Sequence, residues 1–208
     1  MNTRVLVIGD SIVYGAWDTA GGWVDRVKAV MHARAVETQG ATKVQVFNMG
    51  VGGDSSTRVL ARLEHDITTR YKAGWPPVLV LSFGTNDGRE KDGQAETSIE
   101  QFEQNVRDII GIAQKYSDEV LFVGTVPLGQ PSVVFKDHEY FDDRVRSYDE
   151  KLREVVAEAG IRYVSLRTVF EAHGLDGLYA YDVVHCNDAG HALIAATVLP
   201  VLDELLSE

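Results

Sequence analysis

Hydrophobic residues follow two alternating patterns along this chain. Five short runs are almost entirely apolar and rich in β-branched residues, which is typical of parallel strands covered on both faces. We expect these strands at residues 4–9, 43–48, 77–83, 119–126 and 161–166. Between the runs, apolar residues recur at the spacing of a helix that buries one face. We expect these helices at residues 22–37, 55–71, 97–116, 139–159 and 187–206.

Strands and helices that alternate in this way predict an α/β fold, a three-layer α/β/α sandwich around a five-stranded parallel sheet. The expected strand order is 2-1-3-4-5, as in flavodoxin-like folds. In that order, the turns after the first and third strands face each other across a crevice at the carboxyl edge of the sheet. No repeat, low-complexity tract or linker interrupts the pattern, so we expect residues 1–208 to form a single domain.

One stretch does not fit the alternation. Residues 128–138 follow Pro127, which is expected to end the fourth strand, and we expect irregular structure there. The stretch nevertheless holds the apolar run Val133-Val134-Phe135. It is compatible with a lid, a wall of a substrate pocket, a subunit contact or a loop packed on its own domain.

Composition narrows the class of protein. The 208 residues are 45% hydrophobic and 25% charged, as in globular proteins, and the formal net charge of −11 argues against nucleic acid as the main partner. No apolar run approaches the roughly 20 residues of a membrane-spanning helix, so integral membrane insertion is not expected. A single cysteine excludes an internal disulfide, and the lack of a basic and then apolar leader predicts a cytoplasmic protein. Association into a homo-oligomer stays open.

A candidate nucleophile lies at the end of the first strand, in Gly9-Asp10-Ser11. A serine there is at the edge of the sheet where ligands bind, although it also suits the cap of the next helix. To attack an acyl carbon, serine needs a base, usually a histidine oriented by a carboxylate. His185 fits, because Asp182 precedes it by three residues in a predicted tight turn. The other histidines lie within predicted helices or in loops with weaker context: His32, His65, His138, His173 and His191.

Acyl transfer also needs hydrogen-bond donors for the oxyanion of a tetrahedral intermediate. Asn86, after the third strand, can offer its side-chain amide, and the glycine-rich turn at residues 48–54 can offer backbone N–H groups. Each feature has a plainer interpretation, an Asx-turn for Asn86 and ordinary turn geometry for the glycines.

Several other kinds of site lack their sequence patterns. The chain has no G-x-S-x-G motif, no G-x-G-x-x-G after the first strand and no Walker lysine, which argues against an α/β-hydrolase and against the usual nucleotide-binding folds. No His and carboxylate cluster has the spacing of metal ligands. Cys186 has no partner base, and we interpret it as a small buried residue.

Taken together, these motifs resemble those of the SGNH hydrolases, also called the GDSL-like esterase/lipase superfamily. The resemblance spans nearly the whole chain, with the motifs at successive strand ends. They are Gly-Asp-Ser at 9–11, Asn-x-Gly-x-x-Gly-Asp at 48–54, Gly-x-Asn-Asp at 84–87 and Asp-x-x-His at 182–185. Two positions depart from the family pattern: Ile12 replaces a leucine, and Cys186 stands where proline is frequent.

The resemblance implies a serine hydrolase of carboxylic esters that needs no cofactor and no metal. It makes Ser11 the nucleophile, His185 the base and Asp182 the residue that orients the base. Gly53 and Asn86 would join the Ser11 N–H in the oxyanion hole, and the spacing to Asp54 favours Gly53 over Gly52.

The substrate is less defined than the reaction. Asp10 and Asp87 lie within the motifs, and Tyr14 and Trp17 follow the first of them. We expect all four to contact the substrate, although aromatic residues at a helix start also suit a core. A small ester with an acetyl, short acyl or aryl group is expected. A lysophospholipase, a thioesterase and a non-catalytic flavodoxin-like module that binds a small ligand are the alternatives.

Overall fold

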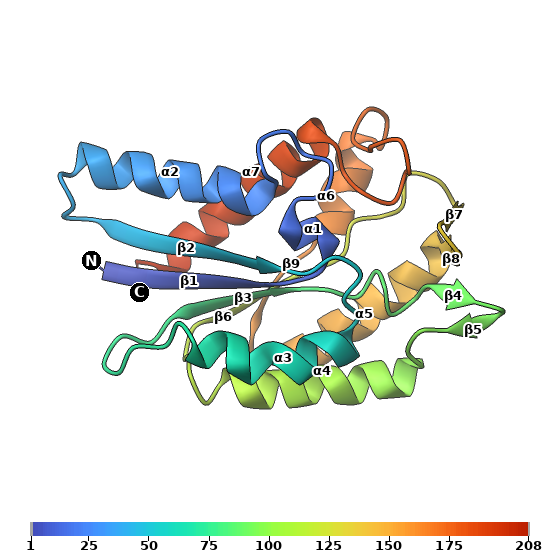
Figure 1. Cartoon of the computed structure of the whole chain (residues 1–208), viewed down its shortest axis with the longest axis horizontal. Helices are drawn as coiled ribbons and strands as arrows, with labels where there is room; N and C mark the ends of the chain where they lie inside the picture. The colour runs from blue at the N-terminus through green and yellow to red at the C-terminus, as the bar shows by residue number, and fades with distance from the viewer. Residues whose placement is uncertain (1, 208) are drawn as a thin grey trace.

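The computed structural model describes residues 2–207, and its centre is a five-stranded parallel sheet (Figure 1). Its order, β2-β1-β3-β6-β9, is the 2-1-3-4-5 order expected for the five predicted strands, so the predicted sheet is confirmed. Because β1 and β3 are neighbours that pair Gly9 with Ser82, the turns after both strands lie side by side. The strands are β1 (Asn2–Gly9), β2 (Lys43–Gly50), β3 (Val78–Ser82), β6 (Val120–Val123) and β9 (Arg162–Val164).

Helices cover both faces of the sheet, as the sandwich requires (Figure 1). Successive residues of β1 point to opposite faces, so Val5 and Val7 pack with one group of helices and Leu6 and Ile8 with the other. This is why the strand is apolar at every position from Val5 to Ile8. The first group is α2 (Trp23–Glu37), α6 (Leu166–His173) and α7 (Asp188–Leu205). The second group is α3 (Ser56–Thr68), α4 (Ile99–Ala113) and α5 (Asp142–Glu158).

The stretch at residues 128–138 is not irregular throughout, which corrects the expectation. It contains β7 (Ser132–Phe135), which forms an antiparallel hairpin with β8 (His138–Phe141). The helix expected from residue 139 therefore begins only where β8 ends, at α5. The hairpin lies at the edge of the molecule where the central strands end (Figure 1).

The hairpin belongs to a second, antiparallel sheet that the hydrophobic pattern does not predict. This four-stranded sheet has the order β5-β4-β8-β7, with β4 (Glu90–Lys91) and β5 (Gln94–Ala95) following β3. Only Glu90 and Glu139 join β4 to β8 in the ladder, across about a quarter of the chain. Strands of two to four residues are too short for a period of two to be recognised.

Several ends also differ from the predicted ones. The fourth central strand ends at Val123 and not at residue 126, because the Thr125 N–H turns away and donates to the buried Asp149 carboxylate at 2.7 Å. Helices α3 and α4 are shorter than expected, and α6 was not expected. Between residues 2 and 207, no helix combines the length and apolar character that crossing a membrane requires.

Candidate active site

Ser11 is the first residue of a short helix, α1 (Ser11–Tyr14), which begins where β1 ends. Asp10 caps this helix by accepting the Ile12 N–H at 2.9 Å. The helix lies directly against β2, where a Cβ on Gly50 would fall 2.1 Å from the Tyr14 backbone nitrogen. Only glycine fits there, and this close approach holds Ser11 at the carboxyl edge of the sheet.

The structure brings Ser11, His185 and Asp182 into one hydrogen-bonded chain. The Ser11 Oγ lies 2.9 Å from His185 Nε2, and His185 Nδ1 lies 2.8 Å from Asp182 Oδ2. The sequence separation of serine and histidine is 174 residues, so only the fold joins them. This geometry lets the imidazole accept the serine proton while the carboxylate holds the other ring nitrogen.

The Asp182 carboxylate is held by several donors besides the His185 ring. Its Oδ1 accepts the Val184 and His185 N–H groups at 3.1 and 2.9 Å, and Trp17 Nε1 donates to Oδ2 at 2.7 Å. Burial opposes ionisation of the carboxyl, but these hydrogen bonds outweigh it and lower the pKa of Asp182 below its ordinary value. The group is therefore ionised at neutral pH.

Two residues beside this carboxylate adopt the left-handed backbone region that L-residues avoid. Trp17 has φ 68° and Val183 has φ 51°, and Val183 is β-branched. Such strain persists where surrounding contacts hold the chain, and here Val183 O accepts the Gly129 N–H at 2.8 Å. His191 steadies the Trp17 turn from α7, because its Nε2 lies 3.2 Å from Ala16 O.

Asn86 and the glycine turn lie next to Ser11 on the same cavity. The Asn86 Nδ2 donates to Asp54 O at 3.0 Å, and its Oδ1 accepts from Arg89 Nη1 at 3.2 Å. These contacts fix which end of the amide carries the hydrogens, and among the described residues none but Asp54 accepts a hydrogen bond from Nδ2. Gly53 has φ 82°, so the turn requires glycine at the position where an N–H donor is expected.

Two of the expected substrate contacts, Asp10 and Asp87, lie beneath the cavity and do not line it. Burial, with the nearby carboxylates of Asp87 and Asp54, raises the pKa of Asp10 to about 7. Burial also raises the pKa of Asp87 to about 6, although its carboxylate accepts the Ser56 N–H and hydroxyl. Both residues brace the backbone turns that carry the site.

Ser11 and His185 open onto a cavity of about 490 Å³. Tyr14 and Trp17 line it, as expected, and each remains about half exposed or more. Phe135, from the hairpin of β7 and β8, packs edge-on against the His185 ring with centroids 5.6 Å apart. Phe135 therefore supplies part of the pocket wall, one of the alternatives that the sequence left open.

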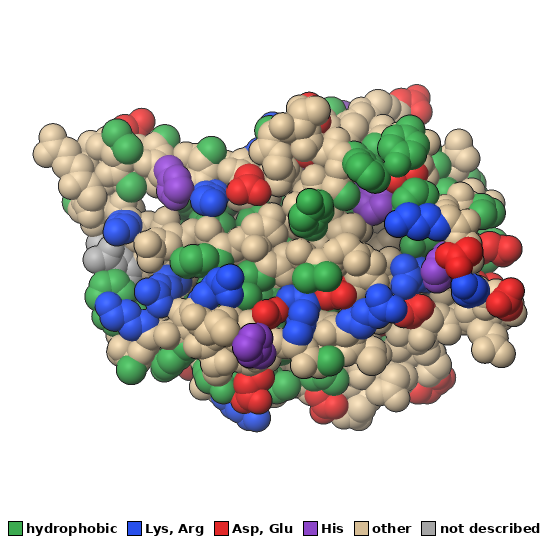
Figure 2. All heavy atoms as spheres, viewed as in Figure 1, with side chains coloured by type: hydrophobic (Ala, Val, Ile, Leu, Met, Phe, Trp, Pro, Cys, Tyr) green, Lys and Arg blue, Asp and Glu red, His purple; other side chains and the backbone are tan. Residues whose placement is uncertain are grey.

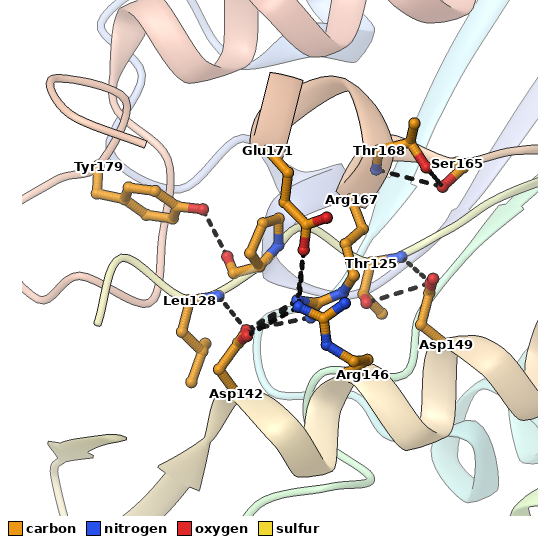
Figure 3. Close-up of polar contacts among 11 residues, drawn as sticks. Thr125, Leu128, Asp142, Arg146, Asp149, Ser165, Arg167, Thr168, Glu171 and Tyr179 are labelled. Atoms are coloured by element: carbon orange, nitrogen blue, oxygen red, sulfur yellow. Dashed lines mark hydrogen bonds and ion pairs between the residues drawn. The ribbon is translucent and has the colours of Figure 1, made fainter. Parts of the chain in front are cut away.

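The root of this hairpin is tied to the body by a partly buried ion pair. Arg167 of α6 donates to both Asp142 oxygens at 3.0 to 3.1 Å, and Asp142 Oδ1 also accepts the Leu128 N–H at 2.8 Å (Figure 3). Nearby, the Tyr179 hydroxyl donates to Pro127 O at 2.6 Å (Figure 3). These contacts position the segment that leads to Phe135.

Besides Ala16 and Glu96, sequence reasoning missed five residues of the cavity wall outside its motifs. They reach the cavity from α3, from the turn after β3 and from the hairpin, and no spacing in the sequence relates them. Arg89 follows Asn86 by three positions, and this closeness to a motif is the one sequence feature that points to it. The missed residues are Arg58, Arg89, Lys136, His138 and Tyr140.

The structure also bears on two other kinds of site, a cysteine nucleophile and a metal centre. Cys186 is fully buried, and burial raises the pKa of its thiol, so it is no thiolate nucleophile. Within residues 2–207, no three His, Cys, Asp or Glu side chains gather as metal ligands would.

The fold is an α/β/α sandwich, and a serine, a histidine and an aspartate are hydrogen-bonded at the carboxyl edge of its sheet. This combination is typical of a class of hydrolases. The chain belongs to the GDSL-like lipase/acylhydrolase family, whose model matches residues 7–193. The resemblance seen in the sequence is thereby confirmed, and the protein is a carboxylic ester hydrolase of this family. No curated protein matches the sequence at a significant level.

Solved structures agree with this fold. The chain is similar to a lipase/acylhydrolase from Enterococcus faecalis, with 22% identity, a TM-score of 0.75 and coverage of 97% of this chain and 96% of that one. It is also similar to a G-D-S-L family member from Veillonella parvula, with 22% identity, a TM-score of 0.74 and coverage of 97% of this chain and 98% of that one. A third similar structure is the acetylxylan esterase Axe2 from Geobacillus stearothermophilus, with 19% identity, a TM-score of 0.73 and coverage of 96% of this chain and 94% of that one.

Proposed function

We propose that the protein hydrolyses small carboxylic esters, with acetyl, other short acyl or aryl groups, through an acyl-enzyme on Ser11. The observation that carries this proposal is the chain of hydrogen bonds from Ser11 through His185 to Asp182, at 2.9 and 2.8 Å. A serine hydroxyl placed in this way can pass its proton to the imidazole as it attacks.

The reaction proceeds in two balanced halves. His185 accepts the Ser11 proton while Oγ attacks the acyl carbon, and then returns that proton to the departing alcohol as the ester bond breaks. Water next attacks the acyl-enzyme while His185 accepts a proton from it, and His185 then returns that proton to Ser11 Oγ as the bond to the acyl group breaks and the carboxylic acid leaves. The ionised Asp182 stabilises the imidazolium that forms in each half.

The oxyanion formed in each half needs donors already in place. We assign this role to the N–H groups of Ser11 and Gly53 and to the side-chain amide of Asn86. Their positions around one cavity support the assignment, and so does the Arg89 contact that orients the amide. Tyr14 and Trp17 would contact the substrate, while the burial of Asp10 and Asp87 speaks against direct contact.

The decisive experiment is labelling with a fluorophosphonate. The wild-type protein should lose esterase activity and gain one adduct mass at Ser11, and Ser11→Ala should neither react nor hydrolyse esters. His185→Ala should lose several orders of magnitude in kcat, and the double variant should be hardly worse, since the two residues act as a unit. An active Ser11→Ala enzyme, or losses that multiply, would contradict the mechanism. A binding module would show neither labelling nor hydrolysis.

A substrate panel separates the related activities. A cavity of about 490 Å³ suits a small ligand, which favours short acyl groups over long lipid chains. We therefore expect kcat/KM to fall as the acyl chain of 4-nitrophenyl esters lengthens from two to twelve carbons. A rise with chain length would support a lysophospholipase, and faster hydrolysis of matched acyl thioesters would support a thioesterase.

A further inference from the structure

The cavity beside Ser11 has the opposite charge to the protein as a whole. The chain carries a formal net charge of −11, yet Arg58, Arg89 and Lys136 all line this cavity. Among the described residues that line it, Glu96 is the one carboxylate. Figure 2 shows Lys and Arg side chains in a band across this face, below a group of hydrophobic side chains. A charge concentrated at a cleft selects the ligands that enter it.

Arg89 is the most constrained of the three cations. Its side chain is only 10% exposed, and its Nε is buried without a hydrogen-bond partner among residues 2–207. Its Nη1 donates to Asn86 Oδ1 and lies 3.8 Å from where a Cβ on Gly53 would be. The guanidinium therefore adjoins two of the three expected oxyanion-hole residues, Asn86 and Gly53. A buried N–H without an acceptor is costly, which points to an acceptor that arrives with the ligand.

Glu96 does not satisfy the two arginines. Arg58 Nη2 and Arg89 Nη2 each lie 3.4 Å from one of its oxygens, well beyond the distance of about 2.7–2.9 Å for a strong ionic hydrogen bond. Arg58 is also more than half exposed and can reorient toward the cavity. Lys136 lies at the hairpin turn, with its Nζ 5.2 Å from the centroid of the Phe135 ring. One carboxylate thus lines the same cavity as three cations, which come from separate segments.

We propose that the ester substrate carries an anionic group, a carboxylate or a phosphate, which Arg58 and Arg89 bind beside the oxyanion site, with Lys136 approaching from the hairpin. This inference rests on the proposed function of Ser11, and it adds the substrate class. Hydrolysis itself is unchanged, because the anionic group takes no part in bond making. The two arginines bind the substrate and set its specificity.

The test compares esters that differ in charge. One pair is mono-4-nitrophenyl glutarate and 4-nitrophenyl pentanoate, which place a carboxylate or a methyl group at the end of the acyl chain. The other pair is 4-acetoxyphenyl phosphate and phenyl acetate, which place a phosphate or nothing on the alcohol. In each pair, the ratio of kcat/KM values is divided by the ratio of the alkaline hydrolysis rates. At least one pair should then favour the charged ester by about 10-fold or more.

Variants identify the residues responsible. Arg58→Gln and Arg89→Gln should each reduce the preference about 10-fold, and Glu96→Gln should increase it, because the competing carboxylate is gone. Arg107→Gln is the matched control, since it removes one exposed positive charge from α4, away from the cavity. The ratio cancels any loss common to both esters, including a disturbed Asn86 in Arg89→Gln. Arg58→Gln changes an exposed side chain and should fold normally.

The outcomes separate this inference from the proposed function. It is overturned if neither pair favours the charged ester, or if the preference is the same in Arg58→Gln, Arg89→Gln and Arg107→Gln. In either case, an inactive Ser11→Ala enzyme would leave the proposed mechanism standing. A binding measurement gives a second readout: glutarate should bind Ser11→Ala more tightly than it binds the Ser11→Ala/Arg58→Gln double variant. Equal affinities would contradict a role for Arg58.

Discussion

At the scale of single residues, the polar side chains of Asn86 and Asp182 are held in place by neighbours that do not react. Asn86 is oriented by Arg89 and by the carbonyl of Asp54, and Asp182 is held by Trp17 and by two backbone N–H groups. Such preorganisation matters because donors fixed beforehand need not reorganise when charge develops in the transition state.

Asn86 provides a direct test of the oxyanion site. Asn86→Ala should lower kcat by about 10²–10³ with little change in KM, because its donor is needed mainly in the transition state. Asn86→Asp should be as poor or worse, since it places a negative charge against the oxyanion. Steady-state kinetics with a 4-nitrophenyl ester measures both. If Asn86→Asp folds and keeps most of its kcat, Asn86 is an Asx-turn residue and not a donor.

Asp182 can be tested separately. Asp182→Asn should reduce kcat strongly, by up to about 10⁴, because an amide cannot stabilise the imidazolium and favours the wrong tautomer. KM should change little, since Asp182 does not line the cavity. Trp17→Phe removes one hydrogen bond to the same carboxylate and should cost far less. A kcat near wild type in Asp182→Asn would mean that serine and histidine suffice.

Asp10 gives a prediction for stability. Its pKa is about 7 in the folded protein against 3.8 when exposed, so between these pH values the folded state holds a proton that the unfolded chain has lost. Its contribution to the free energy of unfolding therefore falls as pH rises through this window. Asp10→Asn still accepts the Ile12 N–H but carries no charge. Relative to wild type, it should gain stability from pH 4 to pH 8 by as much as a few kcal/mol.

Urea denaturation at several pH values measures this difference. The neighbouring acids Asp54 and Asp87 remain in both proteins, so subtraction leaves mainly the contribution of Asp10. The exposed Asp108→Asn is the control and should follow wild type at every pH. A constant difference between Asp10→Asn and wild type would show that Asp10 is ionised throughout.

At the scale of elements, the hairpin of β7 and β8 completes the pocket but depends on contacts at its root. Its strands are only four residues long and pair with β4 through a single residue pair. Short strands of this kind gain little stability by themselves. Three contacts hold the segment in place instead: the Asp142–Arg167 ion pair, the Leu128 N–H on Asp142 and the Tyr179 hydroxyl on Pro127 O (Figure 3).

Removing the carboxylate at this root should be costly. Asp142→Ala leaves Arg167, which is only 5% exposed, with the more distant Glu171 carboxylate at 3.7 Å, and the expected loss of unfolding free energy is up to about 3–5 kcal/mol. Glu158→Ala, at the exposed end of the same helix, breaks a surface pair with Arg107 and should cost about 1 kcal/mol or less. Chemical denaturation compares the two. Equal losses would show that the buried pair contributes no more than a surface one.

At the scale of the whole molecule, one sheet separates two hydrophobic cores, and the site lies at the edge where both cores end. The rest of the surface carries an acidic excess, while the cavity is lined by cations. The two hydrophobic cores therefore support the site from below, while the positive charge of the cavity comes from residues outside these cores.

The central strand β3 tests the contribution of the cores. Leu79 is fully buried, and Leu79→Ala should lower the free energy of unfolding by about 2–5 kcal/mol, because it leaves a cavity at the sheet. Val36→Ala, which changes a side chain that is 79% exposed, should stay within about 0.5 kcal/mol of wild type. Thermal or urea unfolding measures both. A small loss in Leu79→Ala would mean that the core closes around the deletion.

The sequence alone determined the architecture and the residues expected at its functional edge. Long apolar runs buried on both faces have one stable arrangement, a parallel sheet between helices, and the observed strand order agrees with the prediction. Because parallel strands end at a common edge, the turns carrying Ser11 and Asn86 had to lie close together. The contact between Asp182 and His185 could also be predicted from the sequence, because His185 follows Asp182 by only three positions.

The tertiary structure decided what depends on contacts between distant segments. The second sheet rests on pairing between β4 and β8, and neither strand is long enough to show a hydrophobic period. The burial of Asp10 and Asp87, and the meeting of Arg58, Arg89 and Lys136 around one cavity, also have no counterpart in local spacing. Exposed polar residues leave no periodic pattern, so only folding shows which of them share a site.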